Sequence, residues 1–161
     1  MSAAPSDDAL VEALARSAVE QVAPEELPLF RATSEAYFAD PSSLEQGRSR
    51  DDMLGFGVDA ALVLVSPVAL QVAKEVIGFV VAQFREAAAE EGEGAIKRLV
   101  VVHLLVLVPV DEPCDEPVPE LTDEQLQQVR TLALEKARSL RLSDTKATLL
   151  ADSLVGSLAT A

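Results

Sequence analysis

The residue types that could carry out catalysis are scarce in this chain. His103 is the only histidine, which excludes a metal site built on two histidines of one chain. Its apolar neighbours favour a buried structural histidine, with a pH-sensitive or interface role as the alternative. Cys114 is the only cysteine, and acids lie on both sides of it. Because their charge disfavours the thiolate, we expect a poor nucleophile.

The glycines and the acidic pairs add no recognisable site. Residues 55–57 (Gly-Phe-Gly) lack the third glycine of a dinucleotide-binding loop and are better explained by close helix packing or by a flexible entry to the apolar segment that follows. The pair Asp51 and Asp52 lacks the spacing of a calcium-binding loop. Two carboxylates could act as acid and base in a small hydrolase, but any acidic protein supplies such pairs. We therefore predict no catalytic residue, metal, cofactor or small-molecule substrate, and a protein that is not an enzyme.

The composition of the chain limits the classes of possible binding partner and predicts the cellular compartment. The 161 residues include 27 Asp and Glu against 13 Lys and Arg, a net charge of −14, which disfavours binding to nucleic acid. The hydrophobic fraction of 49% predicts a folded chain. The chain has no asparagine or tryptophan, little lysine and isoleucine, and much alanine, valine and leucine, a composition that predicts a GC-rich, bacterial genome. The single cysteine, and the acids Asp7 and Asp8 where a signal peptide would be basic, predict a cytoplasmic protein, with a membrane-associated one as the alternative.

The spacing of apolar residues predicts a mainly α-helical bundle. We expect an acidic helical body over 1–110, an acidic proline-rich linker over 111–120 and a helical hairpin over 121–161. The body begins with helices over about 6–24 and 28–39, followed by a loop over about 40–50. A long, central, apolar helix is expected over about 67–90, with Ser66 as its N-cap. Its polar edge is expected to consist of Gln71, Lys74, Glu75 and Arg85.

Residues 99–110 form a run of almost nothing but valine and leucine. The run is too short for a membrane helix, which needs about 20 residues. Its β-branched residues favour a buried strand, but the chain offers no second strand, so an isolated strand and a buried helix both stay open. An unpaired strand would be an edge for association with another chain.

The hairpin carries the clearest local signals. Thr122 and Gln125 have the spacing of a capping box, and Ser143 is placed to cap a second helix. Residues 121–161 contain five acids and five bases, so the whole charge of −14 belongs to residues 1–120. A neutral hairpin next to an acidic body could either dock on that body within the chain or be presented to a partner protein.

The chain has more apolar surface than its own core is expected to need, and it has no recognisable set of catalytic residues. We therefore predict a non-enzymatic interaction or adaptor protein that binds a protein partner or forms a homo-oligomer. The alternative is a membrane-associated or membrane-inserting protein, or effector, that uses residues 60–84 and 99–110. The candidate interaction residues are Val102, Leu105, Leu107, Leu132, Leu150 and Leu154.

The prediction for the valine- and leucine-rich run is tested by placing a charge in it. Val102→Asp or Leu105→Asp should abolish association, because a carboxylate is costly to bury in an apolar interface. The molar mass in solution, from light scattering after size-exclusion chromatography, measures the association, and circular dichroism checks that the helices remain folded. Association that persists in both variants refutes a role for residues 99–110.

Overall fold

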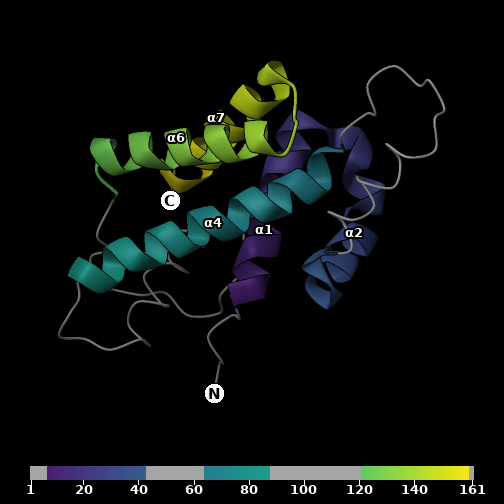
Figure 1. Cartoon of the computed structure of the whole chain (residues 1–161), viewed down its shortest axis with the longest axis horizontal. Helices are drawn as coiled ribbons and strands as arrows, with labels where there is room; N and C mark the ends of the chain where they lie inside the picture. The colour runs from purple at the N-terminus through teal and green to yellow at the C-terminus, as the bar shows by residue number, and fades with distance from the viewer. Residues whose placement is uncertain (1–6, 43–63, 88–120, 160–161) are drawn as a thin grey trace.

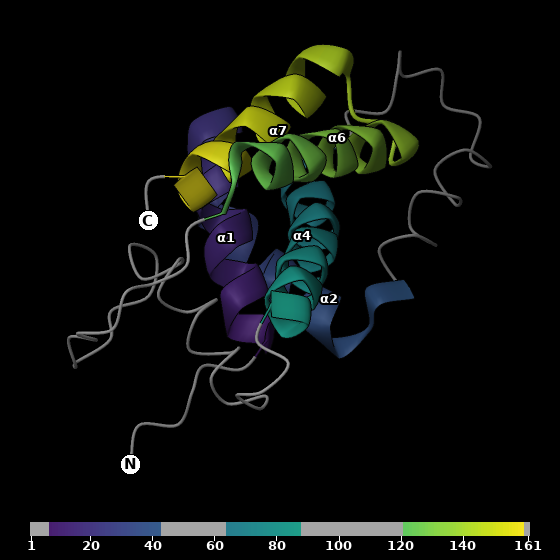
Figure 2. The same cartoon turned by 90° about the vertical axis from the view of Figure 1, so that its left-hand side faces the viewer.

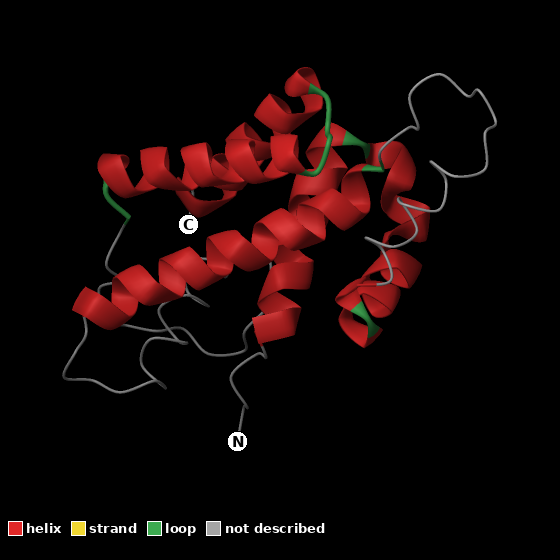
Figure 3. Cartoon of the chain, viewed as in Figure 1, coloured by secondary structure: helices red, strands yellow, loops and turns green. Residues whose placement is uncertain are grey.

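The computed structural model describes residues 7–42, 64–87 and 121–159. These ranges contain five α-helices and a short 3-10 helix, and no strand lies within them (Figure 3). The elements in chain order are α1 (Asp7–Val22), η1 (Pro24–Glu26), α2 (Leu27–Ala39), α4 (Val65–Ala87), α6 (Asp123–Ser139) and α7 (Asp144–Ala159). The predicted mainly α-helical bundle is confirmed.

Several sequence predictions fall outside the described residues and stay predictions. They concern the run 99–110 with its possible strand, the linker 111–120, most of the loop over 40–50, and the C-terminal end of the central helix beyond residue 87. The same holds for His103, Cys114, residues 55–57, and Asp51 and Asp52.

The helices pack as a ring of four with a fifth outside it. In the order α1, α4, α6, α7, each helix contacts the next, and α7 closes the ring on α1. Helix α2 packs on the outside of α1 and α4, and Figure 2 shows it away from the α6–α7 hairpin. Helix α4 is the long apolar helix that the sequence predicts, and it contacts all four other α-helices (Figure 1).

One hydrophobic core joins all five α-helices. The apolar faces of α1, α4 and α7 meet in it at the three- and four-residue spacing of amphipathic helices. Of the two outcomes that the sequence leaves open for the hairpin, the structure shows docking within the chain. The largest fully buried side chains are Leu10, Leu14, Val19, Val65, Val68, Leu70, Val72, Val76, Val80, Leu150 and Leu154.

The polar edge predicted for α4 is present only in part. Lys74 is exposed and Glu75 is half-buried, as expected, but Gln71 is only 8% exposed. The reason is that the first half of α4 is enclosed on all sides, with every residue from 65 to 73 buried. Among the described residues, the Nε2 atom of Gln71 has no hydrogen-bond partner.

Local hydrogen bonds cap the start of α6 and close the turn between α6 and α7. The predicted capping box is confirmed, because Gln125 N donates to Thr122 Oγ1 at 3.2 Å and Thr122 N donates to Gln125 Oε1 at 2.9 Å. Helix α6 ends in a Schellman motif, in which Leu142 N donates to Ala137 O at 3.1 Å. Arg141 occupies the left-handed position of that motif with φ 64°, where glycine is the usual residue. Ser143 then directly precedes α7, as predicted.

Gly78 offers a test of the helical conformation of α4. It lies on an exposed part of α4, and a Cβ added there would have no other atom within 4 Å. Gly78→Ala should therefore raise the free energy of unfolding by about 0.5–1 kcal/mol, because alanine loses less backbone entropy in a helix than glycine. Urea denaturation measures the change. Ala82→Gly, at an exposed position one turn later, is the matched control and should lower stability by a similar amount; a neutral or destabilising Gly78→Ala contradicts this account.

Candidate interaction surface

The structure distributes the interaction residues predicted from sequence over three different environments. Leu150 and Leu154 of α7 are fully buried in the core, with 0% exposure. Leu132 of α6 is half-buried. Val102, Leu105 and Leu107 lie outside the described residues. A partner could touch Leu150 or Leu154 only if the helices of this chain separated, so the surface must be sought among exposed side chains.

Three ion pairs among the described residues join one helix to another. Arg130 Nε lies 2.6 Å from Asp152 Oδ1, and this hydrogen bond, together with the charge of Asp152, raises the pKa of Arg130 above its ordinary value. Lys136 Nζ lies 2.6 Å from Glu75 Oε1, which ties α6 to α4. In the described parts of the chain, no three His, Cys, Asp or Glu side chains group to hold a metal ion.

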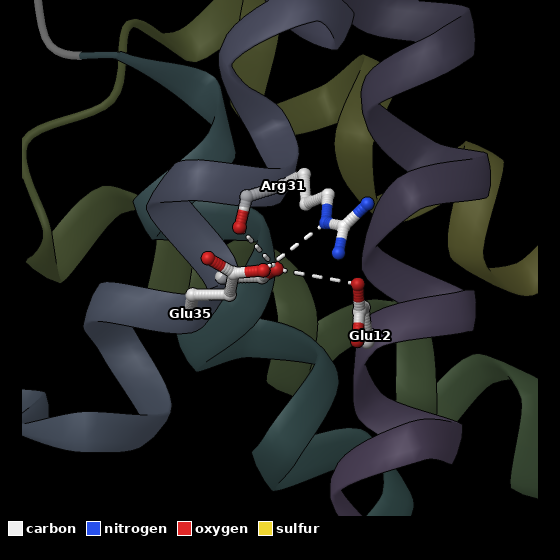
Figure 4. Close-up of polar contacts among 4 residues, drawn as sticks. Glu12, Arg31 and Glu35 are labelled. Atoms are coloured by element: carbon white, nitrogen blue, oxygen red, sulfur yellow. Dashed lines mark hydrogen bonds and ion pairs between the residues drawn. The ribbon is translucent and has the colours of Figure 1, made fainter.

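Helix α2 presents one apolar face to the bundle. Phe30 and Tyr37 on this face are each 3% exposed. Between them Ser34, 1% exposed, places its Oγ 2.9 Å from the carbonyl oxygen of Arg31 and 3.2 Å from Oε1 of Glu12 on α1. Figure 4 shows Glu12 reaching from α1 toward this point of α2. The single hydroxyl proton therefore has two acceptors, one of them a carboxylate on the neighbouring helix.

Glu26 fastens the start of α2 to the start of α4. Its Oε1 accepts a hydrogen bond from Val65 N at 2.9 Å, and its Oε2 accepts from Ser66 N at 2.8 Å and from Ser66 Oγ at 2.7 Å. The first N–H groups of a helix have no acceptor within it, and Pro67 has no N–H. Glu26 therefore supplies the N-terminal cap of α4 across 39 positions of sequence.

This cap explains why α4 begins earlier than the sequence predicts. The sequence predicts Ser66 as the N-cap, with the helix starting at Pro67, but α4 starts at Val65 and contains Ser66 in its first turn. A local cap is unnecessary because the distant carboxylate satisfies both N–H groups. Its negative charge also favours the positive end of the helix dipole.

The opposite face of α2 is apolar and exposed. It is formed by four residues without charge or hydrogen-bonding side chains, which we call the outer face of α2: Leu29, Ala32, Ala36 and Ala39, all exposed. Their spacing of three, four and three residues places them on one stripe of the helix. Leu29 is 66% exposed, the highest value among the large apolar side chains of the described residues. A helix with one face in the core and a second apolar face in water is unusual for a surface helix.

Within the described residues, neither of the other two exposed leucines belongs to an exposed apolar stripe. Leu64, 52% exposed, precedes α4, and Leu149, 50% exposed, lies on α7. One turn on either side of Leu149 are the exposed polar residues Thr145 and Asp152. Single exposed apolar residues of this kind are common on soluble proteins. The outer face of α2 is thus the candidate surface, and the spacing of Leu29 and the three alanines is the sequence signal that could have indicated it.

Comparison of the chain with known protein families, with characterised proteins and with solved structures gives no match.

The fastening of α2 is tested by Glu26→Gln. The amide oxygen keeps one acceptor, but the amide nitrogen faces an N–H donor, so the free energy of unfolding should fall by about 1–3 kcal/mol. Urea denaturation followed by circular dichroism measures it. Glu25→Gln removes the same charge from an exposed neighbour and should change stability by less than about 0.5 kcal/mol. Equal effects of the two substitutions would show that charge, and not the cap, matters.

Proposed function

We propose that this chain is a non-enzymatic helical interaction protein of the cytoplasm that binds a protein partner, or a second copy of itself, through the outer face of α2. The exposed apolar stripe of α2 is the observation that supports the proposal. The other α-helices bury their main apolar faces in the shared core. Helix α2 keeps a second apolar face that no part of the core requires.

The side chains of the outer face favour a helix as the partner. Three alanines let another backbone come close, since interhelical distances shorten with small side chains at the contact. Leu29 supplies one large side chain that a pocket between residues of the partner can take up. Leucine and alanine side chains can bind another protein but cannot catalyse a reaction. The composition of the outer face therefore supports the adaptor role.

A membrane function is the second candidate, and one observation favours it. Residues Val65–Gln83 of α4 form the one helix, within the ranges that the structure describes, that is long and apolar enough to cross a membrane. However, 67% of that window is buried inside the protein, as in the core helix of a soluble domain. Insertion would require α4 to leave all its helical neighbours. Flotation with liposomes decides between the two: we expect the protein to stay in the soluble fraction, and co-flotation would favour insertion.

Site-specific photo-crosslinking in the cells that make the protein tests the proposed function. A photoreactive amino acid at Ala36, in the outer face of α2, should give a discrete crosslinked product, because a bound partner would cover that position. The same amino acid at Gln128, exposed on α6, is the matched control and should give none. Absence of a product at Ala36, or equal products at both positions, overturns the proposal.

A further inference from the structure

We propose that α2 opens from the ring of helices as a unit while the ring stays folded, and that the face of α1 and α4 beneath it is a docking site for an amphipathic helix. In the closed chain α2 itself occupies this site (Figure 2). The site lies on the inner side of α2 and goes beyond the proposed function, which uses the outer face. Two observations carry it: few side chains hold α2 on the ring, and its hydrogen bond to α1 is easily exchanged.

The ring does not depend on α2. Each of α1, α4, α6 and α7 packs directly against two other members of the ring. The N-terminal cap of α4 is also independent of α2, because Glu26 belongs to η1 and precedes α2. Opening of α2 therefore leaves the ring closed and the central helix capped. Native proteins undergo local openings of this kind at a lower free energy than global unfolding.

Helix α2 buries few side chains for its length. Of its 13 residues, Phe30, Ser34 and Tyr37 are buried, whereas α1 and α7, with 16 residues each, bury six. The free energy gained by burial rises with the apolar area that leaves water. Detaching α2 from the ring therefore costs less than detaching α1 or α7.

The hydrogen bond between the middle of α2 and α1 is easily exchanged (Figure 4). Ser34 Oγ lies 3.2 Å from Glu12 Oε1 on α1, but also 2.9 Å from the carbonyl oxygen of Arg31 in its own helix. When α2 opens, the hydroxyl proton keeps the Arg31 acceptor. Glu12 is half-buried, so water replaces Ser34 as the donor to its carboxylate. Opening thus leaves neither group without a hydrogen-bond partner.

The inner side of α2 shows which kind of helix the site accepts. Phe30 and Tyr37 are seven residues apart, which places both on one face of the helix, and each is 3% exposed. The small side chain of Ser34 lies between them, 1% exposed. Helices that dock in apolar grooves use anchors at this spacing. We therefore expect a partner helix with two aromatic side chains seven residues apart and a small residue between them.

The covalent connection makes α2 a competitor of such a helix. A tethered segment competes at an effective concentration in the millimolar range. A separate helix therefore binds only the fraction of molecules in which α2 is open. The packing of α2 on the ring is thus an autoinhibitory contact, and binding becomes tighter when that contact is weakened.

Hydrogen exchange of the full chain, followed by NMR, tests the opening. Amide protons of α2 from Arg31 to Ala39 should exchange at least about tenfold faster than those of α4 from Ala69 to Val80. Val129→Ala, which removes buried methyl groups from α6, should speed exchange in the ring about tenfold. It should leave exchange in α2 unchanged, because the ring stays folded when α2 opens. Equal acceleration of α2 and the ring would show that α2 opens only in global unfolding, and it overturns the proposal.

A labelled synthetic peptide of residues 27–42 tests the docking site. Tyr37→Ala in the full chain weakens the tethered α2, so this variant should bind the peptide at least about tenfold more tightly than the wild type, as measured by fluorescence anisotropy. Phe30→Ala in the chain is a second variant with the same expectation, and circular dichroism checks that both keep their helices. The matched control is a peptide that carries Phe30→Ala and Tyr37→Ala, which should not bind. Failure of the unaltered peptide to bind either variant, or equal binding of the two peptides, overturns the docking site.

Discussion

The carboxylate of Glu26 is the constraint on which the arrangement of the helices depends. Val65 and Ser66 are almost completely buried, 0% and 3% exposed, so water does not readily replace an acceptor for their N–H groups. Helix α4 can begin inside the core because Glu26 reaches it. Glu26 also ends η1 and directly precedes α2. The residue that caps the central helix therefore also joins the start of α2 to the start of α4.

The ring of helices explains why the candidate surface lies on α2. Each member of the ring has a neighbour on either side, and the polar contacts between members are partly exposed, such as Ser17 with Ser157 and Glu75 with Lys136. Two neighbours cover most of a helix's apolar circumference. Helix α2 stands outside the ring and packs on one layer only (Figure 2), so its far side has no neighbour within the described residues.

Local features can be predicted from the sequence, and those that depend on distant residues cannot. The capping box of Thr122 and the apolar stripe of α7 follow from spacing alone, and both are present. The sequence places the start of α4 two residues too late because its cap, Glu26, is 39 positions away. Leu150 and Leu154 have a spacing that predicts burial, but spacing does not say whether the cover is this chain or another. The outer face of α2 is harder to predict from the sequence, because three of its four residues are alanines and alanine carries only a weak hydrophobic signal.

The difference between the two kinds of cap has a consequence for the order of folding. Every signal that starts and turns the α6–α7 hairpin lies within a few residues of its own helix, and contacts of short sequence separation form early because little chain entropy is lost. The cap of α4 needs a long loop to close first. Yet α1 and α4 precede the hairpin in the chain, and synthesis proceeds from the N-terminus. During synthesis, α1 and α4 are therefore made first, and their apolar faces stay uncovered until the fast-folding α6–α7 hairpin has been synthesised.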